Sequence, residues 1–70
     1  MMPITMMDVG ETVIIKKITG KDEVRIHLAQ LGFVVDSKIT VVSKIGKNMI
    51  LQVKESRVAI DSSMANRILC

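Results

Sequence analysis

The fold is decided by the stretch Leu28-Ala29-Gln30-Leu31-Gly32-Phe33, which we interpret as the end of a short helix. Val24, Leu28 and Leu31 recur at helical spacing and therefore share one face. Gly32 stands where a left-handed residue ends a helix without steric cost, and Phe33 follows as the apolar residue that closes such a cap against Leu28. The stretch therefore predicts a helix whose last turn is fixed against the core.

A second junction, from strand to helix, lies at residues 57–65. Arg57–Ile60 has strand character, and Asp61 or Ser62 can accept hydrogen bonds from the first free N–H groups of a helix. We expect this helix to span about residues 62–66. The segment Arg67-Ile68-Leu69 is then predicted to return as a final edge strand.

The first half of the chain predicts a strand followed by the helix. Residues 12–18 are rich in β-branched side chains, but Ile18 is out of phase with Val13 and Ile15, so we expect an irregularity near Lys16-Lys17. Asp22 is suited to the N-cap of the helix, because its carboxylate can accept a hydrogen bond from a free N–H group.

The second half predicts a hairpin. Residues 38–43 form the next expected strand, with Ile39 and Val41 pointing inward. Gly46-Lys47-Asn48 is typical of a hairpin connection. In the strand expected at residues 49–53, Met49, Leu51 and Val53 share one face, and the residues between them share the other. Four or five short strands with one inserted helix predict a mainly β domain, and a small, partly open barrel would limit its exposed edges.

Composition sets further limits. The chain has 70 residues, 49% of them hydrophobic, with a single Phe and no Trp or Tyr, so we expect one domain with an aliphatic core. Cys70 has no partner for an internal disulfide, which favours a reducing, cytoplasmic location. The longest nonpolar run, residues 31–35, is far too short to cross a bilayer, so we expect no membrane insertion.

No known catalytic motif is present. The sequence Asp61-Ser62-Ser63 is better interpreted as a helix cap than as a nucleophile with its base. The net charge of +3 does not require a nucleic acid partner, and the only aromatic residue, Phe33, is assigned to the helix cap. We therefore expect neither an enzyme nor a nucleic-acid-binding protein.

The sequence does not predict a metal site. His27 has only Glu23, four residues earlier, as a plausible companion on the helix, and two ligands are too few for a tight site. Cys70 and the six methionines are soft ligands without a spacing motif. We expect Met49 and Met64 to fill the core and the four N-terminal methionines to pack across one end of the barrel. Weak transition-metal binding stays open, but no cofactor is expected.

The pattern Leu-x-x-Leu-Gly-Phe-x-x-x-x-x-Ile-x-Val at residues 28–41, followed by a hairpin and by Arg-x-Ala-Ile at residues 57–60, resembles the FeoA family. The resemblance implies an SH3-like barrel in a single FeoA-like domain, residues 1–70, with a lead-in at 1–9 and the barrel at 10–70. It gives Leu28, Leu31, Gly32, Phe33 and Ala59 as fold-defining residues. Asp36 stands where the family usually has glycine, and Asp tolerates the left-handed conformation expected there.

The resemblance also implies a function. FeoA proteins are accessory proteins of bacterial ferrous iron transport, and the implied partner is the cytoplasmic GTP-binding region of a FeoB-type membrane transporter. The same fold resembles the C-terminal domain of metal-dependent repressors. The alternative is therefore a stand-alone regulatory domain that binds peptide or a transition metal. Self-association through the apolar N-terminal segment or an open barrel edge is also left open.

The candidate partner surface lies beside the helix. If Val24, Leu28 and Leu31 face the barrel, then Arg25, Ile26 and Gln30 face outward or flank the buried stripe, and an exposed Ile beside an Arg is a plausible contact patch. The alternative, given equal weight, is that Ile26 also packs against the barrel. A basic cluster, Lys16, Lys17 and Lys21, is expected nearby. It could face an acidic partner or be a solvated face.

Overall fold

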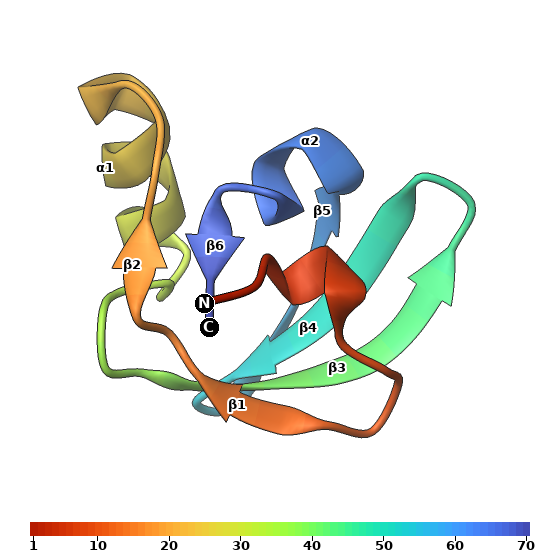
Figure 1. Cartoon of the computed structure of the whole chain (residues 1–70). Coiled ribbons are helices and arrows are strands. Elements are labelled where there is room, and N and C mark those ends of the chain that lie inside the picture. Colours follow the sequence, from red (N-terminus) through yellow and green to blue (C-terminus); the bar gives the residue numbers. More distant parts are fainter.

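The computed structural model describes all 70 residues, and Figure 1 shows a strongly curved sheet that encloses the N- and C-terminal segments. The chain is mainly β, as predicted, with two α-helices and one turn of 3-10 helix. In chain order its elements are η1 (Ile4–Met6), β1 (Thr12–Ile14), β2 (Lys17–Ile18), α1 (Asp22–Gln30), β3 (Lys38–Ile45), β4 (Asn48–Val53), β5 (Ser56–Asp61), α2 (Ser62–Ala65) and β6 (Ile68–Leu69).

The main sheet is antiparallel, with strand order β1-β3-β4-β5. Along β4, Met49, Leu51 and Val53 are buried in strict alternation, which confirms the predicted inner face. The β3–β4 hairpin turns at Gly46-Lys47 as predicted, and β4 and β5 are joined by Lys54-Glu55. A register shift between Val41 and Ser43 lets β3 run on to Ile45, farther than the sequence predicted.

The predicted irregularity near Lys16 is confirmed, because the expected first strand is broken into β1 and β2. At the break, the Ile15 N–H donates to the Ser37 carbonyl over 3.0 Å, and the Asp36 N–H donates to the Ile15 carbonyl over 2.8 Å. Ile15 is fully buried. After the break, β2 leaves the main sheet and pairs with β6. The strand β6 is the predicted final edge strand.

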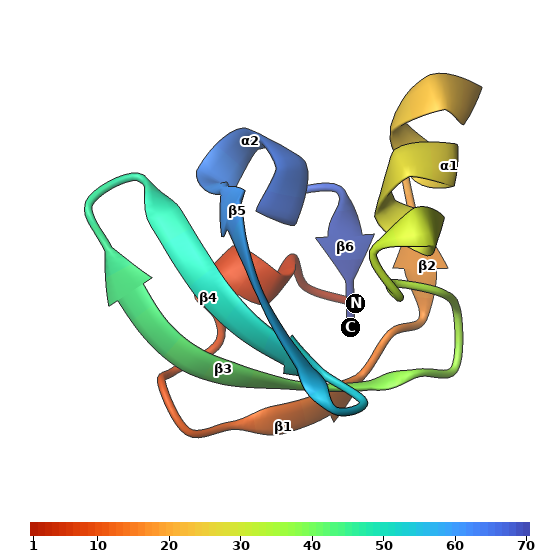
Figure 2. The ribbon, with the colours of Figure 1, turned by 180° about the vertical axis from the view of Figure 1, so that it is seen from behind.

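The chain termini lie side by side in both views of the ribbon (Figures 1 and 2). Met2 and Cys70 exchange backbone hydrogen bonds of 2.9 and 2.8 Å, and Pro3 forms a β-bridge with Leu69. This pairing brings Ile4, from the segment expected to be a lead-in, into the core with no exposed surface. The small β2–β6 sheet is thereby continued by the N-terminal segment.

The N-terminal methionines differ from the expectation that they pack across one end of the barrel. Met1, Met2 and Met6 are 77%, 46% and 62% exposed, and only Met7 packs partly against the core. Ile4 is the residue that fills this end instead, because the 3-10 turn directs its side chain inward. Met49 is buried and Met64 packs against the core, as predicted.

The end of α1 has the predicted geometry. The Phe33 N–H donates to the Leu28 carbonyl and the Gly32 N–H donates to the Ala29 carbonyl, both over 2.9 Å, which is the pair of bonds of a Schellman motif. Gly32 has φ +103°, and Leu28 and Phe33 are both fully buried in one cluster. Leu31 packs partly against the same core.

One local prediction is wrong, and two others need comment. The N-cap of α1 is Lys21, not Asp22, and it makes no side-chain capping bond; Asp22 is the first helical residue, and its carboxylate binds Arg25 instead. Ala59, expected to be fold-defining, lies on the exposed face of β5, whereas its neighbour Ile60 is in the core. Asp36, which stands where the family usually has glycine, has φ +75°, the left-handed conformation expected at this position.

Replacing Gly32 by Ala should destabilise the protein for two reasons. The positive φ is unfavourable for any residue with a Cβ, and that Cβ would lie 3.3 Å from Cγ1 of Val53, a buried residue of β4. We expect Gly32→Ala to lower the free energy of unfolding by about 2–3 kcal/mol, measured by urea denaturation followed by circular dichroism.

Gly10→Ala is the matched control, because Gly10 has φ +93° but a Cβ there would meet nothing within 4 Å. It should cost only the conformational part, about 1–2 kcal/mol. Equal losses in the two variants would mean that close packing of Gly32 against Val53 contributes nothing.

Asp61 caps α2 as predicted: its Oδ1 accepts the Met64 N–H and the Ser63 hydroxyl, both over 2.8 Å. These bonds, the Met64 N–H first, lower the pKa of Asp61 below its usual value. The stabilisation is therefore complete above the unfolded-state pKa, near 4, and is lost as the pH falls through the lower folded-state value.

The variant Asp61→Asn keeps a capping side chain without an ionisable group. We expect the difference in melting temperature between the wild type and Asp61→Asn to shrink as the pH falls from about 6 to about 3, because only the wild type loses a charged cap. Thermal unfolding followed by circular dichroism measures it. A difference that does not change with pH would show that the charge of this carboxylate does not contribute.

Candidate functional site

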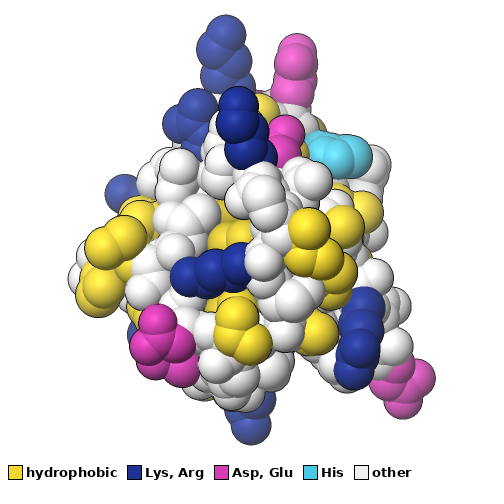
Figure 3. All heavy atoms as spheres, turned by 90° about the vertical axis from the view of Figure 1, so that its right-hand side faces the viewer, with side chains coloured by type: hydrophobic (Ala, Val, Ile, Leu, Met, Phe, Trp, Pro, Cys, Tyr) yellow, Lys and Arg dark blue, Asp and Glu magenta, His cyan; other side chains and the backbone are white.

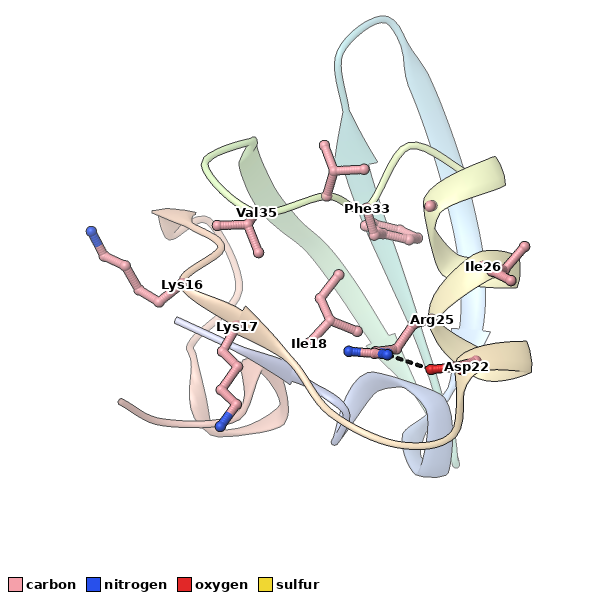
Figure 4. Close-up of a pocket in the computed structure, with 10 residues that line it drawn as sticks. Lys16, Lys17, Ile18, Asp22, Arg25, Ile26, Phe33 and Val35 are labelled. Carbon is pink, nitrogen blue, oxygen red and sulfur yellow. Dashed lines mark hydrogen bonds and ion pairs between the residues drawn. The ribbon is translucent and has the colours of Figure 1, made fainter.

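A groove of about 600 Å³ lies between α1, β2 and the segment that follows α1 (Figure 4). It is the larger of two hollows on the molecule; the second, about 170 Å³ at the β3–β4 hairpin, has one hydrophobic lining residue. The larger groove is lined by Lys16, Lys17, Ile18, Asp22, Arg25, Ile26, Ala29, Phe33, Val34 and Val35. Three separate parts of the chain thus meet at one surface.

The groove has an aliphatic surface above a buried aromatic residue. Phe33 has no exposed surface, and Ile18 is half-buried and packed against the core. Ile26, Val34 and Val35 are 58%, 40% and 52% exposed, an unusual concentration of apolar surface for three residues around one hollow. The helix cap produces this arrangement, because Gly32 redirects the chain so that the segment with Val35 lies across from β2 (Figure 4).

Charged side chains surround this apolar surface. Lys17 is exposed on β2, and Lys16 is exposed just before it. Figure 4 shows both side chains extending away from the centre of the groove. Arg25 reaches from α1 toward Ile18 and pairs with the carboxylate of Asp22. The two side chains of this ion pair are 52% and 81% exposed, so the pair is screened by solvent and contributes little to stability.

The structure brings together four of the five residues expected to contact a partner: Lys16, Lys17, Arg25 and Ile26 all line the groove. Gln30 is exposed but lies outside it. The exposure of Ile26 agrees with the first of the two alternatives considered, in which it faces outward. The positions of these residues do not test whether they contact a partner, so that contact stays a prediction.

Val34 and Val35 were missed by the sequence analysis. They are part of the nonpolar run at residues 31–35, whose length indicates only that it does not span a membrane. The signal that could have revealed them is an apolar pair placed directly after a helix cap, in a connection that should be polar. Residues of this kind in a loop are often exposed for binding.

The remaining reactive side chains are dispersed. No group of three or more His, Cys, Asp or Glu side chains is close enough together to hold a metal ion. His27 is exposed one turn after Glu23 on α1, and burial raises the pKa of the Cys70 thiol, which disfavours the nucleophilic thiolate. Asp61 and Ser63 are occupied with capping α2. These residues do not form a catalytic arrangement.

Away from the groove, charge is mixed. On the face shown in Figure 3, Lys and Arg side chains are spread among hydrophobic and uncharged ones, with acidic side chains between them. No helix in the structure has the length and apolar character required to cross a membrane. The groove is the larger hollow of the molecule, and it combines exposed apolar side chains with three basic residues.

Comparison with known proteins identifies the family. The family model for the FeoA domain matches residues 2–70. The crystal structure of an iron uptake regulatory protein (FeoA) is 28% identical, with a TM-score of 0.88, and the match covers 96% of this chain and 89% of that chain. A search of curated protein sequences gives no match.

Two further structures share the fold. The FeoA of Stenotrophomonas maltophilia complexed with zinc, described as a procaryotic SH3 domain protein, is 23% identical over 99% of this chain and 88% of that chain, with a TM-score of 0.85. A manganese-dependent transcriptional repressor is 17% identical, with a TM-score of 0.87, over 94% of this chain and 38% of the repressor. The match of the family model over nearly the whole chain shows that this SH3-like protein belongs to the FeoA domain family.

Proposed function

We propose that this protein is a non-enzymatic accessory protein of bacterial ferrous iron transport. In this proposal it works in the cytoplasm by contact with the GTP-binding region of a FeoB-type membrane transporter. The contact surface is the groove formed by α1, β2 and residues 33–35. The observation that carries the proposal is the concentration of exposed aliphatic side chains and basic side chains in that one groove.

Membership of the FeoA family supports a role in ferrous iron transport. The FeoA family is associated with ferrous iron transport, and the Stenotrophomonas maltophilia protein is described as a candidate activating factor for that transport. The dispersed reactive groups support a role without catalysis, because neither a nucleophile with a base nor a group of metal ligands is assembled. Under this proposal iron is the cargo of the transporter and not a ligand of this protein.

The composition of the groove supports a protein partner. Ile26, Val34 and Val35 offer apolar surface whose burial would favour association, at roughly 25 cal/mol per Å². Lys16, Lys17 and Arg25 at the rim would select the partner by charge and speed the encounter. An apolar centre with a polar rim is the usual anatomy of a protein interface.

The alternative is a stand-alone regulatory domain like those of metal-dependent repressors. The likeness to the manganese-dependent repressor favours it only at the level of the fold, because the two chains are 17% identical. The FeoA structure is more similar in sequence, at 28% identity, and is covered to 89% of its own length. We therefore prefer the accessory role in transport.

The double variant Arg25→Glu plus Ile26→Asp should weaken binding to the purified cytoplasmic domain of the cognate transporter by at least about tenfold, equivalent to ~1.4 kcal/mol. It reverses one charge at the rim and places a carboxylate on exposed apolar surface. Biolayer interferometry measures the dissociation constant, and circular dichroism checks that the variant is folded.

The matched control is Ile45→Asp plus Lys47→Glu at the β3–β4 hairpin. Ile45 is 61% exposed, nearly the same as Ile26, and the change in net charge is identical, but the site lies outside the groove. The control should bind like the wild type. Undiminished binding by a folded Arg25→Glu plus Ile26→Asp protein would reject the groove as the contact surface.

A further inference from the structure

The rim of the groove is mainly positively charged. Three basic residues line it, Lys16, Lys17 and Arg25, against one acidic residue, Asp22. Lys17 lies on β2 with Lys16 directly before it, and Arg25 reaches from α1 toward Ile18 of β2, so a bound segment would meet basic side chains from both parts of the chain (Figure 4). Carboxylates on a ligand would complement this arrangement.

The apolar surface of the groove is aliphatic. Its large exposed apolar side chains, Ile26, Val34 and Val35, are branched, and Phe33 beneath them has no exposed surface. The chain contains no Trp or Tyr and no other Phe. Proline-rich segments are recognised by SH3 domains through grooves lined with exposed aromatic side chains. This groove therefore lacks the chemistry of that recognition although the fold is SH3-like.

We infer that the groove recognises a short peptide segment in which aliphatic side chains are flanked by carboxylates, and that it does not recognise proline-rich segments. The aliphatic side chains would pack on Ile26, Val34 and Val35, and the carboxylates would pair with Lys16, Lys17 and Arg25. This inference rests on the proposed function only for the source of the segment, which would be the cytoplasmic part of the transporter.

Asp22 has a specific part in this recognition. Its carboxylate already pairs with Arg25, in an exposed ion pair that solvent can open. An incoming carboxylate must therefore compete with Asp22 for the guanidinium. Removing the charge of Asp22 should tighten the binding of an acidic peptide, whereas it should leave the binding of an uncharged aliphatic peptide unchanged.

The test uses a random dodecapeptide phage library panned on the full-length protein. We expect enriched peptides to be acidic and aliphatic. In fluorescence anisotropy with a labelled enriched peptide, Lys17→Glu plus Arg25→Glu should weaken binding at least about tenfold. Asp22→Asn should strengthen it about two- to threefold, and the hairpin control Ile45→Asp plus Lys47→Glu should leave it unchanged.

Enrichment of proline-rich or basic peptides, no enrichment, or an affinity that is the same in the Lys17→Glu plus Arg25→Glu protein would overturn the inference. The transporter domain provides the independent arm. If acidic peptides bind the groove and the transporter domain does not, the proposed function fails and the inference stands. If the transporter domain binds at the groove and no acidic peptide does, the inference fails and the proposed function stands.

Discussion

The arrangement of this protein depends on how α1 ends. The Phe33 N–H bonds to the Leu28 carbonyl over 2.9 Å, while the side chains of both residues are buried without exposed surface in one core cluster. The backbone bond is possible because Gly32 adopts a φ of +103°, which a residue with a Cβ adopts only with strain. The end of the helix is therefore tied to the core by backbone and side chain together.

The candidate site follows from that constraint. Because Val24 and Leu28 face the core, the opposite side of α1 presents Arg25 and Ile26 to solvent. After the cap, the chain passes Val34 and Val35 and is held again where Asp36 and Ser37 bond to Ile15. Both ends of this apolar segment are thus fixed by backbone hydrogen bonds. An exposed apolar surface can persist on such a rigid frame without collapsing into the core.

The opposite wall of the groove depends on the two chain ends. The strand β2 has only two residues and pairs with β6, which in turn is held by the bridge between Pro3 and Leu69 and by the bonds between Met2 and Cys70. Such short strands are stable only through their partners. The position of Lys17 therefore depends on contacts between residues at the two extremes of the sequence.

Local patterns were sufficient to predict much of this fold. The capped end of α1, the alternating inner face of β4 and the cap of α2 by Asp61 all rest on chemistry within a few residues. The burial of Ile4 could not be predicted in the same way, because its neighbours have no periodicity and its position is set by pairing with the C-terminus. The N-cap at Lys21 was missed because the Asp22 carboxylate binds Arg25 rather than a helix N–H.

The candidate site was only half predictable. Arg25 and Ile26 could be found because a helix with a known buried face also has a known exposed face. Val34 and Val35 lie in an irregular segment, where no period distinguishes an exposed side chain from a buried one. Their proximity to Lys16 and Lys17 requires the break between β1 and β2. The sequence indicated this break but not the direction that the chain takes after it.

The central claim is that the groove is the surface through which this protein contacts its partner. Amide hydrogen exchange of the protein, free and bound to the cytoplasmic domain of its cognate transporter, tests it most directly. The account predicts slowed exchange in residues 16–18, 22–29 and 33–35 and unchanged exchange in the β3–β4 hairpin. Slowed exchange confined to the hairpin or to β5, with residues 16–18 and 33–35 unaffected, would contradict it.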